Sequence, residues 1–132
     1  MAVFKNKEIM KKIFGEIWNG LILETVLSSE LRDYDISILY MITDPDMTMY
    51  IDGDGAIFDK AAEARTPAII ASLSGDTAHR FWLEKLEMTN ALATKQIRAR
   101  GSVTKLLRLL PLLKLVQEAY PAYCRKYDLP MN

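Results

Sequence analysis

The segment from Thr66 to Leu113 constrains the fold of this 132-residue chain more than any other part of it. It reads as a strand, a helix, a short helix, a strand and the start of a long helix, and nearly every periodic position in it is apolar. Almost none of its polar residues are of the kind that performs chemistry. A domain with so much apolar lining is better suited to holding an apolar ligand than to converting one.

Apolar residues at helical spacing predict a helix near the start of the chain, from Lys7 to about Leu27. Gly20 is a position where this helix is expected to bend or divide, because glycine lacks the side chain that limits backbone freedom. The charged segment from Leu31 to Asp35 is predicted to be a connection.

Alternating polarity predicts strands over Ile36–Ile42 and Met47–Ile51, with a weaker third strand around Ala56–Asp59. The segments Asp44-Pro45-Asp46 and Asp52-Gly53-Asp54-Gly55 lie between them. Both are typical of hairpin turns, because glycine and aspartate tolerate the positive backbone angles of tight turns.

After these strands, the sequence predicts further strands and helices in turn, the last of which is a long helix. Pro111 and Pro121 are expected to break or kink that helix, since proline donates no amide hydrogen. Together with the earlier elements, the series predicts an α+β layer fold with a mostly antiparallel five-stranded sheet and helices grouped on one face. The predicted elements are a strand with Ile69, Ala71 and Leu73 inward, a helix from Ser74 or Asp76 to about Leu86, a short helix over Met88–Thr94, a strand over Gln96–Gly101, and a helix from Val103.

Length and composition favour one soluble domain over residues 1–132. The 17 basic and 17 acidic residues balance, whereas a nucleic-acid-binding protein would need a strong basic excess. The single cysteine, Cys124, excludes an intramolecular disulfide and suits a reducing compartment. The N-terminal residues lack the apolar run of a secretory signal. We therefore expect a cytoplasmic protein that does not bind nucleic acid.

Charge is nevertheless distributed unevenly along the chain. Residues 33–63 contain eight acids and one base, whereas residues 95–126 contain eight bases and one acid. One interpretation is that solvated faces partly neutralise each other in the fold. The other is a basic surface that meets anionic lipid headgroups or an acyl-CoA phosphate, giving a transient contact with an anionic membrane surface.

Candidate catalytic and metal sites are few. His79 is the only histidine, and its predicted helix offers no acid at triad or ligand spacing on the same face. Asp52 and Asp54 suggest a calcium loop, but the positions for its first and last ligands would then hold Tyr50 and Ala61. We therefore expect no catalytic residue, no metal site and no cofactor.

Six short segments, in this order and spacing, resemble the sterol carrier protein type 2 family of nonspecific lipid-transfer domains. The resemblance is clearest over Thr66–Leu113 and extends more loosely from about Ile36 to Tyr120. The segments are Leu73-Ser74-Gly75-Asp76-Thr77, Phe81-Trp82, Lys85-Leu86, Ala91-Leu92-Ala93-Thr94, Ile97-Arg98-Ala99-Arg100-Gly101 and Lys105-Leu106-Leu107.

The resemblance implies an apolar ligand tunnel between the sheet and its helices. Without it, the apolar stripe of the last helix and the Phe81-Trp82 pair would be interpreted as plain core. With it, sixteen residues become candidates for ligand binding. They are Trp18, Ile38, Tyr40, Met49, Ile69, Phe81, Trp82, Met88, Leu92, Ile97, Ala99, Val103, Leu106, Leu107, Leu110 and Leu113.

The chain departs from the family pattern at the ends of two helices. Glu84 stands where family members usually carry glycine, Lys95-Gln96 stands where a Gly-Lys pair is usual, and Met88 stands where proline is common. Left-handed backbone at a helix exit is easiest for glycine. These departures put the shape of the tunnel mouth in question.

The sequence therefore predicts noncovalent binding and carriage or presentation of an apolar small molecule, such as a fatty acyl chain, acyl-CoA, phospholipid or sterol-like compound. One alternative is an interaction module, including a homodimer, that serves a lipid-metabolising enzyme. A second is an acyl-processing enzyme such as a thioesterase, which needs a poised carboxylate on a buried helix. Glu16, at the edge of the first apolar stripe, is the candidate for that role.

Overall fold

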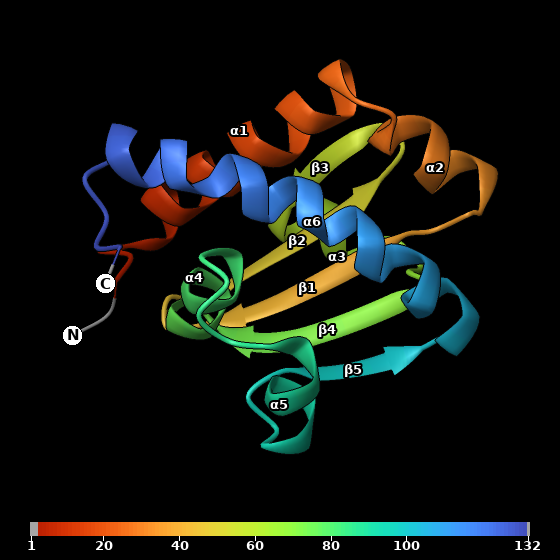
Figure 1. The fold of residues 1–132 in the computed structure, drawn as a ribbon. Helices are drawn as coiled ribbons and strands as arrows, with labels where there is room; N and C mark the ends of the chain where they lie inside the picture. Colours follow the sequence, from red (N-terminus) through yellow and green to blue (C-terminus); the bar gives the residue numbers. More distant parts are fainter. Residues whose placement is uncertain (1–2, 132) are drawn as a thin grey trace.

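A five-stranded sheet forms the centre of the structure, a computed structural model that describes residues 3–131 (Figure 1). Its strand order is β3-β2-β1-β4-β5, in which β1 and β4 are parallel and the other neighbours antiparallel. The sheet is thus mostly antiparallel, as the alternating segments predict. The strands are β1 (Ile38–Thr43), β2 (Met47–Asp52), β3 (Gly55–Phe58), β4 (Ile69–Ser74) and β5 (Arg98–Gly101).

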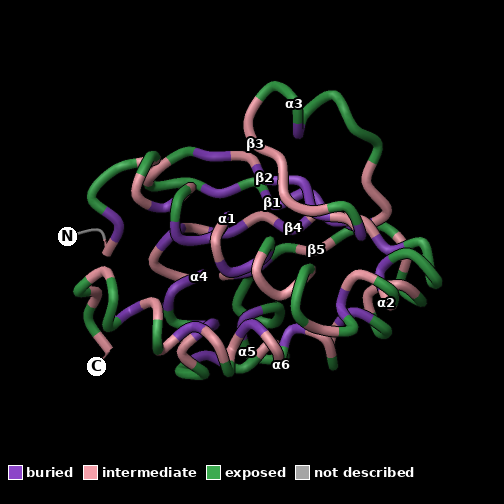
Figure 2. The backbone as a smooth tube through the Cα atoms, turned by 90° about the horizontal axis from the view of Figure 1, so that it is seen from above, coloured by how far each residue is buried: buried purple, intermediate pink, exposed green. Residues whose placement is uncertain are grey.

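Helices cover one face of this sheet almost completely. The longest, α6, crosses the face above β1 and β4, with α1 beside it (Figure 1). The short helix α3 lies on the opposite side of the sheet (Figure 2). The helices are α1 (Lys7–Glu24), α2 (Leu27–Asp33), α3 (Asp59–Glu63), α4 (Gly75–Trp82), α5 (Met88–Ala93) and α6 (Val103–Lys126).

The alternation of the strands decides which residues enter the core. On β1, Ile38, Tyr40 and Ile42 face the helices and belong to the main core. Leu39 points to the other face, where it packs in a small cluster with Tyr50 and with Ala62 of α3. The sequence did not predict α3, because five residues are too few to establish a helical period.

Most of the segment predicted as a charged connection, from Leu31 to Asp33, belongs to the helix α2, so that part of the prediction is wrong. Its apolar residues Leu27 and Leu31 are both buried, one helical turn apart. Its polar residues also bind the β2–β3 turn, since Ser28 Oγ and Arg32 Nη2 donate to the carbonyl of Gly53 at 2.8 and 3.1 Å. These contacts with a distant turn stabilise a seven-residue helix that local pattern alone does not indicate.

Neither proline breaks α6, so the predicted break, one of the two expected effects, is wrong. The helix is continuous from Val103 to Lys126, with Pro111 and Pro121 inside it. At Pro111 the missing amide would have paired with the carbonyl of Leu107, a solvent-exposed residue whose carbonyl water can satisfy. Burial of one face of α6 offsets the remaining free-energy cost of placing proline inside the helix. The fully buried residues on that face are Leu109, Leu113, Val116, Tyr120 and Cys124.

The other helix also differs in detail from its prediction. Gly20 lies within α1 and does not divide it, and the helix ends at Glu24. No helix in residues 3–131 is both long enough and apolar enough to cross a membrane.

Candidate functional site

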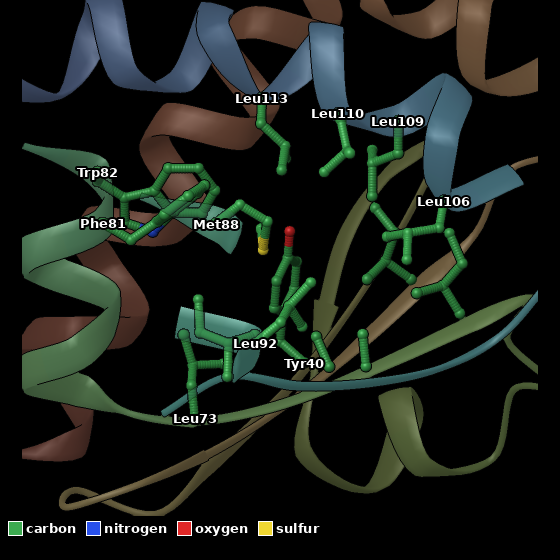
Figure 3. Close-up of a pocket in the computed structure, with 15 residues that line it drawn as sticks. Tyr40, Leu73, Phe81, Trp82, Met88, Leu92, Leu106, Leu109, Leu110 and Leu113 are labelled. Carbon is green, nitrogen blue, oxygen red and sulfur yellow. The ribbon is translucent and has the colours of Figure 1, made fainter. Parts of the chain in front are cut away.

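An apolar cavity lies between the sheet and the helices α4, α5 and α6 (Figure 3). Its volume is about 50 Å³. The strands β1, β4 and β5 form its floor, and the first half of α6 forms its roof. The lining residues are Ile38, Tyr40, Ile69, Ala71, Leu73, Phe81, Trp82, Met88, Leu92, Ile97, Ala99, Leu106, Leu109, Leu110 and Leu113.

Most of the sequence-predicted binding residues meet at this cavity. Four do not line it. Trp18 and Met49 are buried in the core behind it, where the Trp18 ring lies 6.0 Å from that of Tyr40 between centroids. Val103 and Leu107 are 69% and 62% exposed, so they point away from the sheet. The twelve that line it are Ile38, Tyr40, Ile69, Phe81, Trp82, Met88, Leu92, Ile97, Ala99, Leu106, Leu110 and Leu113.

Three lining residues, Ala71, Leu73 and Leu109, are absent from the predicted set. The signals for all three are present in the sequence. Ala71 and Leu73 alternate with Ile69 on the inward face of β4. Leu109 follows Leu106 by three residues, which places both on one side of a helix. Spacing along α6 does not account for Leu107, which is exposed although it precedes the lining residue Leu110 by only three positions.

Small side chains in the floor create the space. Ala71 of β4 and Ala99 of β5 are directly paired in the sheet. At the end of β5, Gly101 has a φ of +117°, and a Cβ there would stand only 2.2 Å from the carbonyl oxygen of Ala68. The glycine therefore lets the edge strand pack closely on β4. Two adjacent alanines then leave room beneath the long leucines of α6.

Tyr40 is the single hydroxyl-bearing residue of the lining, and no lining residue carries a charge. Its hydroxyl points into the cavity (Figure 3), although the residue as a whole is only 7% exposed. Burial raises the pKa of the Tyr40 phenol above its usual value, because an apolar environment disfavours the charged form. The phenol therefore stays protonated and can donate a hydrogen bond.

A hollow on the surface, with a volume of about 320 Å³, adjoins the cavity. The two spaces share four lining residues, so they meet at these side chains. At the rim of the hollow, Gln117 of α6 donates a hydrogen bond to the carbonyl of Phe81 at 3.1 Å and so joins α6 to α4. We call this hollow the mouth. The shared residues are Phe81, Met88, Leu110 and Leu113.

Although glycine is replaced at the ends of α4 and α5, the backbone there still adopts the left-handed conformation that the family pattern implies. Glu84 and Lys95, which replace glycines, have φ values of +61° and +62°, so both adopt the left-handed conformation. This conformation costs a non-glycine residue roughly 1–2 kcal/mol. Met88 is the first residue of α5, the position where proline is favoured in helices. The loops around the mouth thus retain their turns at some cost in strain.

His79 has a structural place, away from the cavity lining. Its ring is 4% exposed, and Nε2 lies 2.7 Å from the carbonyl oxygen of Pro130. Because a carbonyl only accepts, Nε2 carries the proton, and Nδ1 accepts from the Tyr120 hydroxyl at 2.7 Å. Burial lowers the pKa of His79, which favours this neutral form. Within residues 3–131, no group of histidine, cysteine and carboxylate side chains could hold a metal ion.

The Glu16 carboxylate of α1 contacts residues at the C-terminal end of α6. It accepts a hydrogen bond from the Tyr127 hydroxyl, and Lys126 Nζ lies 3.2 Å from its Oε1. These contacts, Tyr127 first, hold the pKa of Glu16 below its usual value. A thioesterase carboxylate would have to face the bound acyl group, and Glu16 does not line the cavity.

The basic segment from residue 95 to residue 126 is partly neutralised, but mostly by acids outside the acidic segment. Lys126 pairs with Glu16, as described, and Lys114 pairs with Glu84 at 2.6 Å. Lys105, 3.3 Å from Asp35, joins the two oppositely charged segments directly. Arg98 and Arg100 are both exposed on β5, next to the cavity floor.

Comparison with known proteins gives a result at the level of fold. No protein-family model and no curated protein matches the sequence. Solved structures do match, among them sterol carrier protein 2 from Yarrowia lipolytica in its apo form, at a TM-score of 0.62 and 15% identity, covering 83% of this chain and 90% of that one. Domain 2 of the sterol carrier protein of Helicoverpa armigera has a TM-score of 0.64 and 15% identity, with coverages of 84% and 87%.

A third match is sterol carrier protein 2 from Aedes aegypti, solved in complex with the C16 fatty acid palmitate. It has a TM-score of 0.53 and 12% identity, and the alignment covers 76% of this chain and 93% of that one. All three are small domains that this chain matches over most of their length. The resemblance noted in the sequence is therefore confirmed at the level of structure: this chain has the fold of the sterol carrier protein 2 domains.

Proposed function

We propose that the chain binds an apolar small molecule, such as a fatty acyl compound or another lipid, in the cavity between sheet and helices. The observation that carries this proposal is the cavity itself, whose lining holds one hydroxyl and no charge. Binding is driven by removing apolar surface from water, at ~0.8 kcal/mol per buried methylene. None of the lining residues is an acid, a base or a strong nucleophile, so the role is to carry or present the ligand rather than to convert it.

The ligand must enlarge the cavity as it enters. A volume of about 50 Å³ is far below the ~300–1,000 Å³ of pockets that enclose drug-sized ligands. The mouth provides the direction of opening, because it shares four lining side chains with the cavity. Met88 and Leu110 are two of these, and both are unconstrained by hydrogen bonds. Movement of the first half of α6 away from the sheet would join the two spaces.

The fatty acid in the Aedes aegypti structure supports this proposal, since that domain shares the fold of this chain. Which ligand this chain binds depends on the residues that line its own cavity. Carriage between membranes or presentation to an enzyme both require reversible binding, and the ordering of a flexible chain reduces the affinity below the gross gain from burial.

An interaction module remains the second candidate, and it rests on Val103 and Leu107. These apolar residues lie one turn apart on α6, and both are mostly exposed. A dimer formed through them would show a concentration-dependent mass in sedimentation, and Leu107→Lys would abolish that dependence. A monomeric mass at all concentrations would exclude self-association by this surface.

Binding is tested with delipidated protein and the hydrocarbon fluorophore diphenylhexatriene, displaced by unlabelled fatty acyl compounds. Leu110→Trp places a large ring in the roof of the cavity and should weaken binding at least tenfold. The matched control is Leu107→Trp, on the exposed side of the same helix, which should bind as the wild type does. Equal binding by both variants, or no binding by the wild type at tens of micromolar, would refute the proposal.

A further inference from the structure

The hydroxyl of Tyr40 is the one hydroxyl among the residues that line the proposed site, and it points into the cavity (Figure 3). Tyr40 lies in the middle of β1, and its ring projects from the sheet toward α6 (Figure 3). The residue is 7% exposed, and its hydroxyl makes no hydrogen bond to any residue in the described range 3–131. Every fully buried side-chain polar atom in this range has a hydrogen-bond partner, so the Tyr40 hydroxyl is not sealed in the core but borders the open space of the cavity.

The other buried tyrosine near the helices shows the contrast. Tyr120, which is completely buried, has its hydroxyl 2.7 Å from Nδ1 of His79. Its polar atom is therefore matched within the protein. Packing alone would be served at position 40 by phenylalanine, which has the same ring without the unpaired donor. The Tyr40 hydroxyl is thus placed where a group from outside the chain can meet it.

The surroundings of the hydroxyl restrict the group that it can meet. No lining residue has a positive charge that could balance a carboxylate, and an ionised group buried without a partner is strongly disfavoured. Tyr40 itself remains a protonated donor, because its burial raises the pKa of the phenol. An uncharged oxygen that accepts a hydrogen bond satisfies both conditions.

We infer that Tyr40 is the specificity-determining residue of the cavity and that the ligand is a long apolar molecule bearing an uncharged acceptor oxygen, such as a ketone, ester or quinone carbonyl. The oxygen sits within the apolar envelope against the Tyr40 hydroxyl. This inference rests on the proposed function and goes beyond it, since it names the chemistry by which the site distinguishes among lipids. It separates such a ligand from a plain hydrocarbon and from an ionised fatty acid.

The test compares three ligands of equal chain length: tridecane, 2-tridecanone and tridecanoate at pH 8. Each displaces diphenylhexatriene from delipidated wild-type protein. The ketone should bind about tenfold more tightly than the alkane, the size of effect expected for one hydrogen bond to a desolvated donor. Tridecanoate should bind more weakly than the ketone. Equal affinity for ketone and alkane would overturn the inference while leaving the proposed function intact, whereas failure of all three to bind would overturn both.

Two conservative variants complete the experiment. Tyr40→Phe should abolish the preference for the ketone, bind tridecane at least as tightly as the wild type does, and melt at the same or a higher temperature, because it removes an unpaired donor. Tyr120→Phe is the matched control. It should melt at a lower temperature, since it breaks the bond to His79, yet keep the ketone preference. A ketone preference that survives in Tyr40→Phe would overturn the assignment of Tyr40.

Discussion

Lys114 of α6 and Glu84 after α4 form an ion pair across the mouth, with Nζ and Oε1 2.6 Å apart. Both residues lie close in sequence to side chains that line the cavity and the mouth alike, Lys114 next to Leu113 and Glu84 three residues after Phe81. The hydrogen bond to Glu84 raises the pKa of Lys114, so the Lys114 ammonium stays protonated at neutral pH. The contact joins the two elements that must part when a ligand enters.

The first prediction concerns this ion pair. Lys114→Met should speed ligand uptake and release severalfold, with little change in equilibrium affinity, because opening the mouth becomes easier for entry and exit alike. Added salt should speed exchange in the wild type and have less effect in the variant, since exposed charges are screened. Stopped-flow fluorescence of diphenylhexatriene measures both rates. The control is Lys105→Met, which breaks the ion pair between Lys105, near the start of α6, and Asp35. Ligand exchange in this variant should proceed at the wild-type rate.

The second prediction concerns the volume above Ala99. Ala99→Val adds two carbons to a floor position that borders empty space, so the free energy of unfolding should be unchanged or rise by up to ~1–2 kcal/mol. Ligand affinity should fall, because the added carbons take space that the ligand needs. Ser72→Val, on the opposite face of the sheet, should leave affinity unchanged. Urea denaturation and ligand titration supply the two measurements, and a marked loss of stability in Ala99→Val would show that the floor is already filled.

A larger residue at the same position gives a different result. An engineered apolar cavity of about 150 Å³ holds benzene, and the cavity found here, at about 50 Å³, has a third of that volume. Ala99→Phe should therefore overpack the delipidated protein and destabilise it by ~1–3 kcal/mol.

The third prediction uses the lowered pKa of His79. The unfolded chain binds a proton at this residue below about pH 6.5, whereas the folded chain does so only at lower pH. Stability is thus fully present above pH 6.5 and is lost as the pH falls from there through the folded pKa. His79→Gln should be less stable at pH 8 but show a shallower decline between pH 7 and 5.5. Denaturation curves over that range are decisive, since an identical decline in both proteins would contradict the assignment.

The fourth prediction addresses Arg98 and Arg100, which are exposed on the edge strand. We expect them to assist delivery to anionic membranes. Reversing both to glutamate should slow transfer of a bound fluorescent lipid to vesicles containing phosphatidylserine, while ligand affinity stays the same. Reversing Lys5 and Lys60, also exposed, changes net charge by the same amount and should slow transfer less. Transfer rates that do not depend on salt in the wild type would contradict an electrostatic contribution.

Much of the fold is predictable from local pattern. The alternation of β4 identifies its inward face. Ser74, one of the two positions given for the start of the next helix, accepts a hydrogen bond from the amide of Thr77 as a helix N-cap does. The aspartate- and glycine-rich segment at residues 52–55 forms the predicted turn between β2 and β3. In each case the deciding interactions involve residues only a few positions apart.

The incorrect predictions from sequence concern features that depend on contacts between residues far apart in the chain. Helix α2 forms because Ser28 and Arg32 reach Gly53, twenty residues or more along the chain. Leu107 and Leu110 have the same apolar character, yet only the second faces the cavity, since the orientation of α6 depends on which of its sides packs against the sheet. Continuity through Pro111 likewise depends on burial of the rest of the helix.

The sequence by itself therefore determines the order of the elements, the faces of the strands and the apolar, nearly charge-free character of the site, because these follow from periodicity and side-chain chemistry. Only the tertiary structure decides that Ala71 and Ala99 lie side by side, that about 50 Å³ remains above them, and that the Tyr40 hydroxyl points into that space. A cavity is the difference between the volume that several distant elements enclose and the volume that their side chains fill. That difference depends on how the elements pack together and cannot be read from any one of them.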